Sequence, residues 1–262
     1  MSLSTKIKLF SALGLAVAGL GMSVPTVAKA AQTQTATTRA TVAFTQDNQT
    51  PENPVDPEHP DQPGDGSNPG TGNTGALTLD YVSNFNFGVH KISPSQQTYT
   101  ATMDNANKSA NFAQVTDKRA GDPKGWTLKV TEKGQLQSAK SQKQLKGAQI
   151  SLTDSRAGSG LGLSPDQVNV TDQKLLPDNQ AVVMNALAGN GYGLWTDAWG
   201  TKDNPGVKLT VPTGAYPEED VYTTSLNWSL EDIPTNGSNP NSPTPTTVPG
   251  GAQGAVNADQ GN

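Results

Sequence analysis

Cysteine is missing from all 262 residues, and histidine occurs only twice, as His59 and His90. The absence of cysteine excludes disulfide bonds, iron–sulfur clusters, cysteine zinc sites and thiol nucleophiles. It also excludes a lipid-modified N-terminal cysteine. Two isolated histidines, one in a Pro-rich segment and one near a turn, argue against a histidine metal centre or a Ser-His-Asp triad.

Long apolar runs are also scarce, and the single one lies near the start of the chain. Residues 9–24 are apolar or small throughout, Lys6 and Lys8 precede them, and Ala28-Lys29-Ala30 follows. This order predicts a secretory signal peptide over residues 1–30, cleaved after Ala30. No later run approaches the ~18 to 20 residues of a membrane span, so we expect an exported mature protein without one. An exported domain without disulfides suits a bacterium that secretes through a single membrane.

Basic side chains are outnumbered once the signal peptide is removed. The remaining chain holds 15 basic and 23 acidic residues, a formal charge of −8. This excess of negative charge argues against nucleic acid as a partner. There is no phosphate-binding loop or dinucleotide fingerprint, and nothing selects a pair of acids for glycoside hydrolysis. We therefore expect a protein that is not an enzyme and uses no cofactor or metal.

Three segments are poor in the apolar residues that build a core. Residues 31–46 are rich in Thr, Gln and Ala, with one short strand predicted at Thr41–Gln46. Residues 47–75 combine repeated Pro and Gly with six acids, which predicts an extended acidic linker. Calcium binding by its carboxylates is the alternative, but their spacing fits no calcium loop. Residues 235–262 are low in apolar residues, so we expect a disordered tail. The tail contains no LPxTG sorting motif.

Between the linker and the tail, apolar and polar residues alternate with period two, the pattern of half-buried strands. Turn sequences such as GDPKG, EKGQ and KDNPG separate these runs. We therefore predict an all-β protein, a single β-sandwich or barrel-like domain over residues 76–234. The expected strands are 77–81, 97–103, 111–116, 125–131, 149–153, 180–187, 206–211 and 222–230.

A Trp-x-Leu unit occurs in two of these strands. Trp126 and Leu128 lie in GWTLKV, and Trp228 and Leu230 lie in YTTSLNWSLEDIP. Each unit falls on the apolar face of its strand, which favours packing in the core. The alternative is a sugar-binding platform, because indole rings stack against the C–H faces of sugars and donate one N–H.

Three more aromatic residues, Tyr192, Trp195 and Trp199, lie in the glycine-rich sequence GNGYGLWTDAWG. We predict a loop between strands. Large aromatics in a loop are costly to expose, so they either fold back onto the core or form a surface for glycan or protein. In the second case Asp197 would bond sugar hydroxyls.

Five lysines lie close together in sequence, with only Glu132 among them. They are Lys129, Lys133, Lys140, Lys143 and Lys146. A solvated turn is the favoured interpretation, and a site for teichoic-acid phosphates is the alternative.

These motifs, in this order, resemble the WxL-domain cell-surface proteins of low-GC Gram-positive bacteria. The resemblance runs from TVAFTQ and VDPEHPDQPG through GALTLDYVSNFNFGVHKIS, GWTLKV, LKGAQISL and VKLTVPTGAY to YTTSLNWSLEDIP. It implies a β-rich domain that binds the wall non-covalently, with peptidoglycan as ligand. It also implies co-assembly with other WxL proteins and with a membrane-anchored partner bearing a WxL-interacting domain. Members commonly end soon after the final motif, whereas here a polar tail follows.

The resemblance makes the two Trp-x-Leu units candidate binding residues beside the aromatic sequence. We therefore expect a secreted protein attached to the cell wall within a surface complex. Two other functions remain open from the sequence: an adhesin for a host matrix protein, and a hydrolase of wall glycan.

Overall fold

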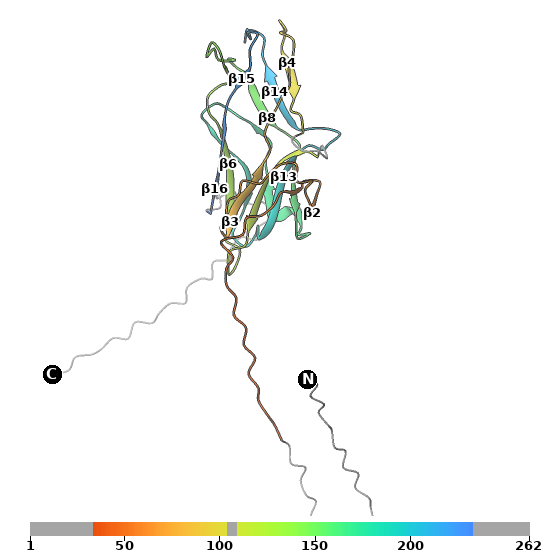
Figure 1. Cartoon of the computed structure of the whole chain (residues 1–262), viewed down its shortest axis with the longest axis vertical. Helices are drawn as coiled ribbons and strands as arrows, with labels where there is room; N and C mark the ends of the chain where they lie inside the picture. Colours follow the sequence, from red (N-terminus) through yellow and green to blue (C-terminus); the bar gives the residue numbers. More distant parts are fainter. Residues whose placement is uncertain (1–33, 104–108, 233–262) are drawn as a thin grey trace, which may run out of the picture. The chain divides into compact units, whose positions relative to one another are not determined.

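The computed structural model describes residues 34–103 and 109–232 of the chain. The predicted signal peptide and the predicted C-terminal tail lie outside these residues. From Phe44 onward the described residues belong to one compact unit, whereas residues 34–43 carry no regular secondary structure. Antiparallel strands account for nearly all of the regular structure, which confirms the all-β prediction (Figure 1).

Three four-stranded antiparallel sheets form the body of the domain. The first has the order β10 (Val168–Val170), β12 (Gln180–Ala186), β6 (Trp126–Glu132), β16 (Leu226–Glu231). The second is β11 (Gln173–Lys174), β8 (Gln149–Leu152), β14 (Val207–Val211), β4 (Gln97–Thr100). The third is β3 (Leu77–Val82), β5 (Asn111–Asp117), β13 (Gly193–Trp199), β9 (Ser155–Ser159). Two short ribbons pair β1 (Val55–Asp56) with β2 (His59–Pro63), and β7 (Gln137–Ser138) with β15 (Tyr222–Thr223); η1 (Pro165–Gln167) is a single 3₁₀ turn.

The two strands that carry Trp-x-Leu are neighbours in the first sheet. β16 pairs with β6 so that Trp228 lies opposite Val130 and Leu230 opposite Leu128. One apolar core draws on all three sheets, and its fully buried residues include Trp126, Leu128, Trp195 and Trp199. Side chains that alternate along the strands supply it, as expected for packed antiparallel sheets.

Most of the predicted strands are present, with ends shifted by up to three residues. The run 222–230 is divided into β15 and β16, although its inward alternation at Tyr222, Leu226 and Trp228 is retained. The short strand predicted at Thr41–Gln46 is absent, because this segment pairs with no other strand among the described residues.

The prediction of a loop in GNGYGLWTDAWG, residues 189–200, is wrong. Residues 193–199 form β13, which lies between β5 and β9 and pairs along its length with β5. A strand covered on both faces loses the apolar-polar alternation that marks a strand in sequence. In β13 the acidic Asp197 lies on the same face as Trp195 and Trp199, which pack in the core. A charged residue on the buried face disrupts the alternation of apolar and polar residues still further.

Residues 47–75, which we call the acidic segment, do not behave as a free linker. Lys118 lies 3.5 Å from Asp47 and 3.0 Å from Glu52. Val55 N–H donates to Gln114 Oε1 at 2.9 Å, and Gln114 Nε2 donates to the Asn53 carbonyl at 3.0 Å. Thr71 N–H donates to the Asp80 carbonyl at 2.6 Å. The outer face of β3 and β5 carries buried polar side chains that need partners, and the segment supplies them. The third sheet is consequently covered on both faces.

Candidate functional site

The first Trp-x-Leu unit is part of the core. Trp126 and Leu128 have no exposed surface, and Trp126 Nε1 donates to the Gly191 carbonyl at 3.0 Å. Gly191 has φ of +80°, and a Cβ there would lie 2.7 Å from Trp126 Nε1. The turn before β13 therefore needs glycine so that its backbone can satisfy the indole. In this arrangement Trp126 cannot stack against a ligand.

The second unit lies at the boundary between core and surface. Trp228 and Leu230 are partly buried and pack against the core. The Trp228 ring stacks on Trp199 with centroids 5.9 Å apart, and Phe85 meets Trp199 edge-on at 5.6 Å. Trp228 also lines a large surface hollow. Of the four residues in the two units, Trp228 is the one that lines an open hollow.

The aromatic residues predicted as a contact loop are separated by the structure. Trp195 and Trp199 are fully buried in β13, and Trp195 Nε1 donates to the Tyr192 carbonyl at 3.0 Å. Only Tyr192 is open to solvent, with 45% of its surface exposed. The two tryptophans are therefore core residues, and the predicted aromatic surface is not formed.

Asp197 is buried beside these tryptophans and is not available to a sugar. Its Oδ2 accepts a hydrogen bond from Trp199 Nε1 at 3.1 Å. Burial raises the pKa of Asp197 well above its ordinary value of 3.8. A buried carboxyl of this kind serves the structure of β13 rather than a binding surface.

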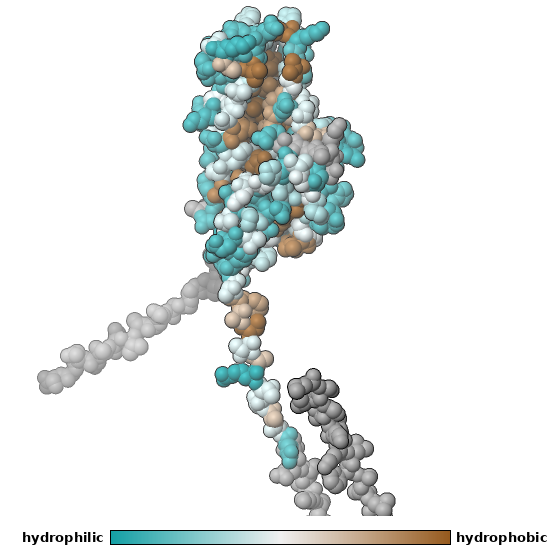
Figure 2. All heavy atoms as spheres, viewed as in Figure 1, coloured by the Kyte–Doolittle hydropathy of each residue, from teal (hydrophilic) through white to brown (hydrophobic). Residues whose placement is uncertain are grey.

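The larger of two hollows described here has a volume of about 1180 Å³, and we call it the apolar groove after the aliphatic and aromatic residues that line part of it. It lies between the segment 82–99 and the strands β15 and β16, and Leu136, Ile150 and Leu209 form part of its floor. Figure 2 shows this face as a band of hydrophobic residues along the upper part of the domain, between more hydrophilic rims. The aromatic rings of Tyr99, Tyr222 and Trp228 also line it.

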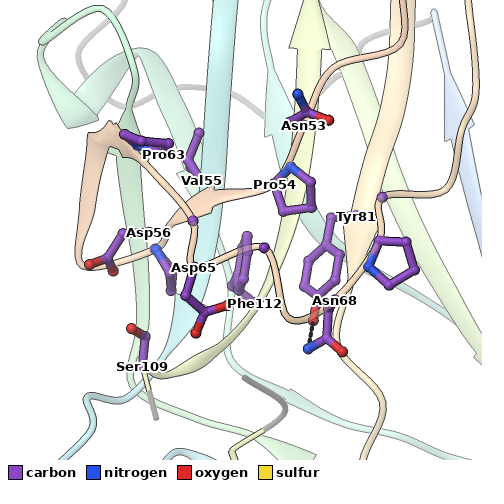
Figure 3. Close-up of a pocket in the computed structure, with 15 residues that line it drawn as sticks. Asn53, Pro54, Val55, Asp56, Pro63, Asp65, Asn68, Tyr81, Ser109 and Phe112 are labelled. Carbon is purple, nitrogen blue, oxygen red and sulfur yellow. Dashed lines mark hydrogen bonds between the residues drawn. The ribbon is translucent and has the colours of Figure 1, made fainter. Parts of the chain in front are cut away.

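A smaller hollow, which we call the polar pocket, has a volume of about 400 Å³. The acidic segment forms most of its wall, and Tyr81 and Phe112 from β3 and β5 lie beneath it (Figure 3). These two rings pack together with centroids 4.5 Å apart and an interplanar angle of 32°. The pocket thus combines an aromatic base with a polar wall.

The wall of the polar pocket carries amide and carboxylate groups. Asn68 Nδ2 donates to Tyr81 Oη at 3.2 Å (Figure 3). Asp56 Oδ1 accepts from Glu58 N–H, and Asp65 Oδ1 accepts from Ser67 N–H, both at 2.9 Å. Each of these hydrogen bonds fixes the orientation of a carboxylate within its own turn. The sequence reasoning missed this pocket, because the Pro-Gly spacing of the segment indicates turns but not the strand face that they cover.

Comparison with protein families decides what kind of protein this is. The model of the family described as "WxL domain surface cell wall-binding" matches residues 31–234. The chain belongs to the WxL family. It is thus a surface protein with a cell wall-binding domain. The comparisons with curated proteins and with solved structures gave no match.

Three of the five clustered lysines lie close to acids in this WxL domain. Lys129 Nζ lies 2.7 Å from Glu231, and Lys140 and Lys143 lie 3.8 Å from Asp220 and 3.4 Å from Glu218. The acids oppose the positive charge that the cluster would otherwise offer to a polyanion.

Among residues 34–103 and 109–232, no group of three or more His, Asp or Glu side chains is arranged to hold a metal ion. In the same part of the chain, no helix is long and apolar enough to cross a membrane.

Proposed function

We propose that this WxL protein attaches to the cell wall by binding peptidoglycan non-covalently, and that the polar pocket holds a sugar of the glycan strand. The observation that supports this most is the aromatic base of Tyr81 and Phe112 beneath a wall of amide and carboxylate groups. Sugars present a C–H face to aromatic rings and hydroxyl and amide groups at their edges. A volume of about 400 Å³ suits a unit of this size.

The charge of the pocket favours the glycan strand over teichoic acid. Asp56 and Asp65 line the pocket, and Glu58 and Asp61 lie in the same hairpin. Carboxylates accept hydrogen bonds from sugar hydroxyls, whereas they repel phosphates. Because three of the five clustered lysines lie close to acids, the cluster does not offer a strong competing site for a polyanion.

Binding without hydrolysis is the activity that we propose. A glycosidase needs one carboxyl with a raised pKa next to a second, ionised one. Among the described residues, burial raises the pKa of Asp80, Glu132 and Asp197. None of these three lines the polar pocket or the apolar groove.

We also propose that the protein is secreted through residues 1–30 and works in a surface complex. The other members would be further WxL proteins and a membrane-anchored protein with a WxL-interacting domain. The apolar groove supports protein contacts, because a hollow of this size lined by aromatic and aliphatic residues is stabilised when a partner covers it.

Sedimentation with purified peptidoglycan tests the proposed ligand. Asn68→Ala and Asp65→Ala should each weaken binding about tenfold, since each removes a hydrogen-bonding group from the pocket. Asp61→Ala is the matched control, because Asp61 belongs to the same segment but does not line the pocket. Walls stripped of teichoic acid should bind equally well.

Four results would contradict this proposal in different ways. Equal binding by all three variants would show that the polar pocket does not bind peptidoglycan. Binding that is lost when teichoic acid is removed from the wall would identify teichoic acid, rather than peptidoglycan, as the ligand. Release of reducing sugar from peptidoglycan would show a hydrolase, and binding to host matrix protein without binding to the wall would show an adhesin.

A further inference from the structure

The apolar groove lies between the last strands of two sheets. β16 ends the order β10-β12-β6-β16, and β4 ends the order β11-β8-β14-β4. Both strands contribute to the groove, β16 through Leu226 and Trp228 and β4 through Gln97 and Tyr99. A terminal strand offers unpaired backbone N–H and C=O groups along one side. The groove therefore combines apolar side-chain sites with open strand edges, which together suit an added β-strand.

The chain also contains a strand-like segment without a partner. In Thr41–Gln46, Val42 and Phe44 alternate with Thr41, Ala43 and Thr45. Val42 is 72% exposed and Phe44 is 90% exposed, and the segment pairs with no strand among the described residues. Such a segment has both the β-propensity and the alternation of a strand, but in this structure it buries neither apolar side chain.

We propose that Thr41–Gln46 of one copy of this protein inserts as an added strand into the apolar groove of a second copy. Val42 and Phe44 occupy the apolar sites above the groove floor, while Ala43 and Thr45 face solvent. The backbone of the segment bonds to the open edge of β16 or β4. The assembly is homotypic, and the segment supplies the strand that this face of the sandwich lacks.

The reach of the segment favours a second copy over the same chain. Asp47, next to Gln46, pairs with Lys118 at 3.5 Å, and Lys118 N–H bonds to the Ala76 carbonyl beside the start of β3. The groove begins at Val82, at the other end of β3. Five strand steps separate these points, about 17 Å, and six extended residues span only about 20 Å. In its own chain the segment would use nearly its whole length to reach the groove, and too few residues would remain to lie along it.

Charge is complementary between the segment and the acidic part of the groove rim, while Lys91 and Lys140 line other parts of the groove. Arg39 is the only charged residue between positions 31 and 46. Glu218, Glu219 and Asp220 lie together at the rim of the groove. Lys143 and Lys140 pair with the first and third of these acids, while no ion pair of Glu219 is recorded among the described residues. An approaching Arg39 is attracted to this rim, which would speed association at low salt.

The proposed contact joins two different surfaces of the same protein. Each copy inserts its segment into the groove of one neighbour and accepts the segment of another neighbour in its own groove. The interface is therefore heterologous and allows open chains of copies. The test uses the mature chain, residues 31–262, in sedimentation velocity over a concentration series. The mature protein should associate as its concentration rises.

Two disrupted variants and two matched controls locate the contact. Val42→Asp/Phe44→Asp disrupts the inserted face, and Ala43→Asp/Thr45→Asp adds the same charge to the opposite face. Leu226→Asp disrupts the groove, and Asn227→Asp changes the exposed neighbour on β16. The disrupted variants should lose association by at least about a hundredfold, and the controls should keep it.

Mixing the two disrupted variants gives the decisive result. Each is blocked at a different surface, so together they should form a one-to-one heterodimer that grows no further. Circular dichroism melts show whether each variant folds, and Val221→Asp replaces Leu226→Asp if the latter unfolds, because Val221 lines the groove and is 65% exposed. A mature protein that stays monomeric at millimolar concentration would overturn the proposal, as would association that survives both disruptions or a mixture that forms no heterodimer.

Discussion

Glu132 illustrates how one residue affects the stability of this domain. Its side chain is completely buried at the end of β6, and neither carboxylate oxygen has a hydrogen-bond partner among the described residues. Burial, and then the negative charge of Asp178, raises the pKa of Glu132 from 4.5 to about 7. The folded state therefore binds the proton more tightly than the unfolded chain does.

This difference predicts a fold that is most stable at mildly acidic pH. The contribution of Glu132 to stability is full below about pH 4.5 and is lost as pH rises to about 7, a loss of about 3 kcal/mol. Glu132→Gln should raise the melting temperature at pH 7.5 and flatten its dependence on pH. Asp197 has a raised pKa as well and should leave a residual slope of the same sign. Denaturant unfolding from pH 4 to 8 measures the effect, with Glu219→Gln as the control, because Glu219 is exposed. An unchanged slope in Glu132→Gln would contradict the prediction.

The tryptophans provide a second prediction at the same scale. Trp126→Ala and Trp195→Ala should each lower the free energy of unfolding by about 3 to 5 kcal/mol, because both side chains are fully buried and both indole N–H groups are bonded. Tyr192→Ala, at a ring that is 45% exposed, should cost much less. Denaturant titrations compare the three variants. A small effect for Trp195→Ala would support the loop that the sequence predicted.

At the scale of elements, one buried glutamine fastens the acidic segment to the third sheet. Gln114 accepts from Val55 N–H and donates to the Asn53 carbonyl and to Asp80 Oδ2. Thr78 and Thr116 donate to the same aspartate at 2.6 Å each. This network holds the hairpin β1–β2 over the outer face of β3 and β5, and it thereby shapes the polar pocket.

Gln114→Ala should therefore release the acidic segment. The substitution leaves the Val55 N–H and the Asn53 carbonyl without their partner, at a cost of about 2 to 3 kcal/mol. Amide hydrogen exchange should rise in residues 53–70 while β6 and β12 stay protected, and peptidoglycan binding should weaken. Gln62→Ala is the control, since Gln62 is exposed and bonds only to Asp61. Protection that is unchanged in Gln114→Ala would show that the segment is held by other contacts.

Elements of this domain differ in how far the sequence reveals them. Strands with one buried face, such as β6 and β14, keep their alternation and were predicted within two residues of their ends. β13 is covered on both faces and buries Asp197, so the polarity of its sequence says little about its position. β5 is also buried along its length, yet its predicted bounds differ from the observed ones by only one residue. The Pro-rich segment has no core of its own, and its order depends on Gln114 and Asp80, which are distant in sequence. For the same reason the polar pocket could not be predicted, whereas the role of Trp126 in the core could.

At the scale of the whole molecule, the two hollows divide the proposed tasks between separate surfaces. The polar pocket is built from the acidic segment, β3 and β5, and the apolar groove from β4, β14, β15 and β16 with the chain after β3. The two lining sets share no residue. Attachment to the wall and association between copies are therefore separable by substitution, unless multivalent binding to the wall links them through avidity.

Deletions at the two ends should separate these properties. Removal of residues 235–262 should leave both peptidoglycan binding and association intact, because the family match ends at residue 234. Removal of residues 31–46 from the mature chain should abolish association, since it removes Val42 and Phe44, but should leave the intrinsic affinity for soluble peptidoglycan fragments unchanged. Sedimentation velocity and titration calorimetry measure the two properties on the same preparations. Loss of fragment binding in the first deletion would place part of the binding surface in the tail, and loss in the second would place it in the N-terminal segment rather than in the polar pocket.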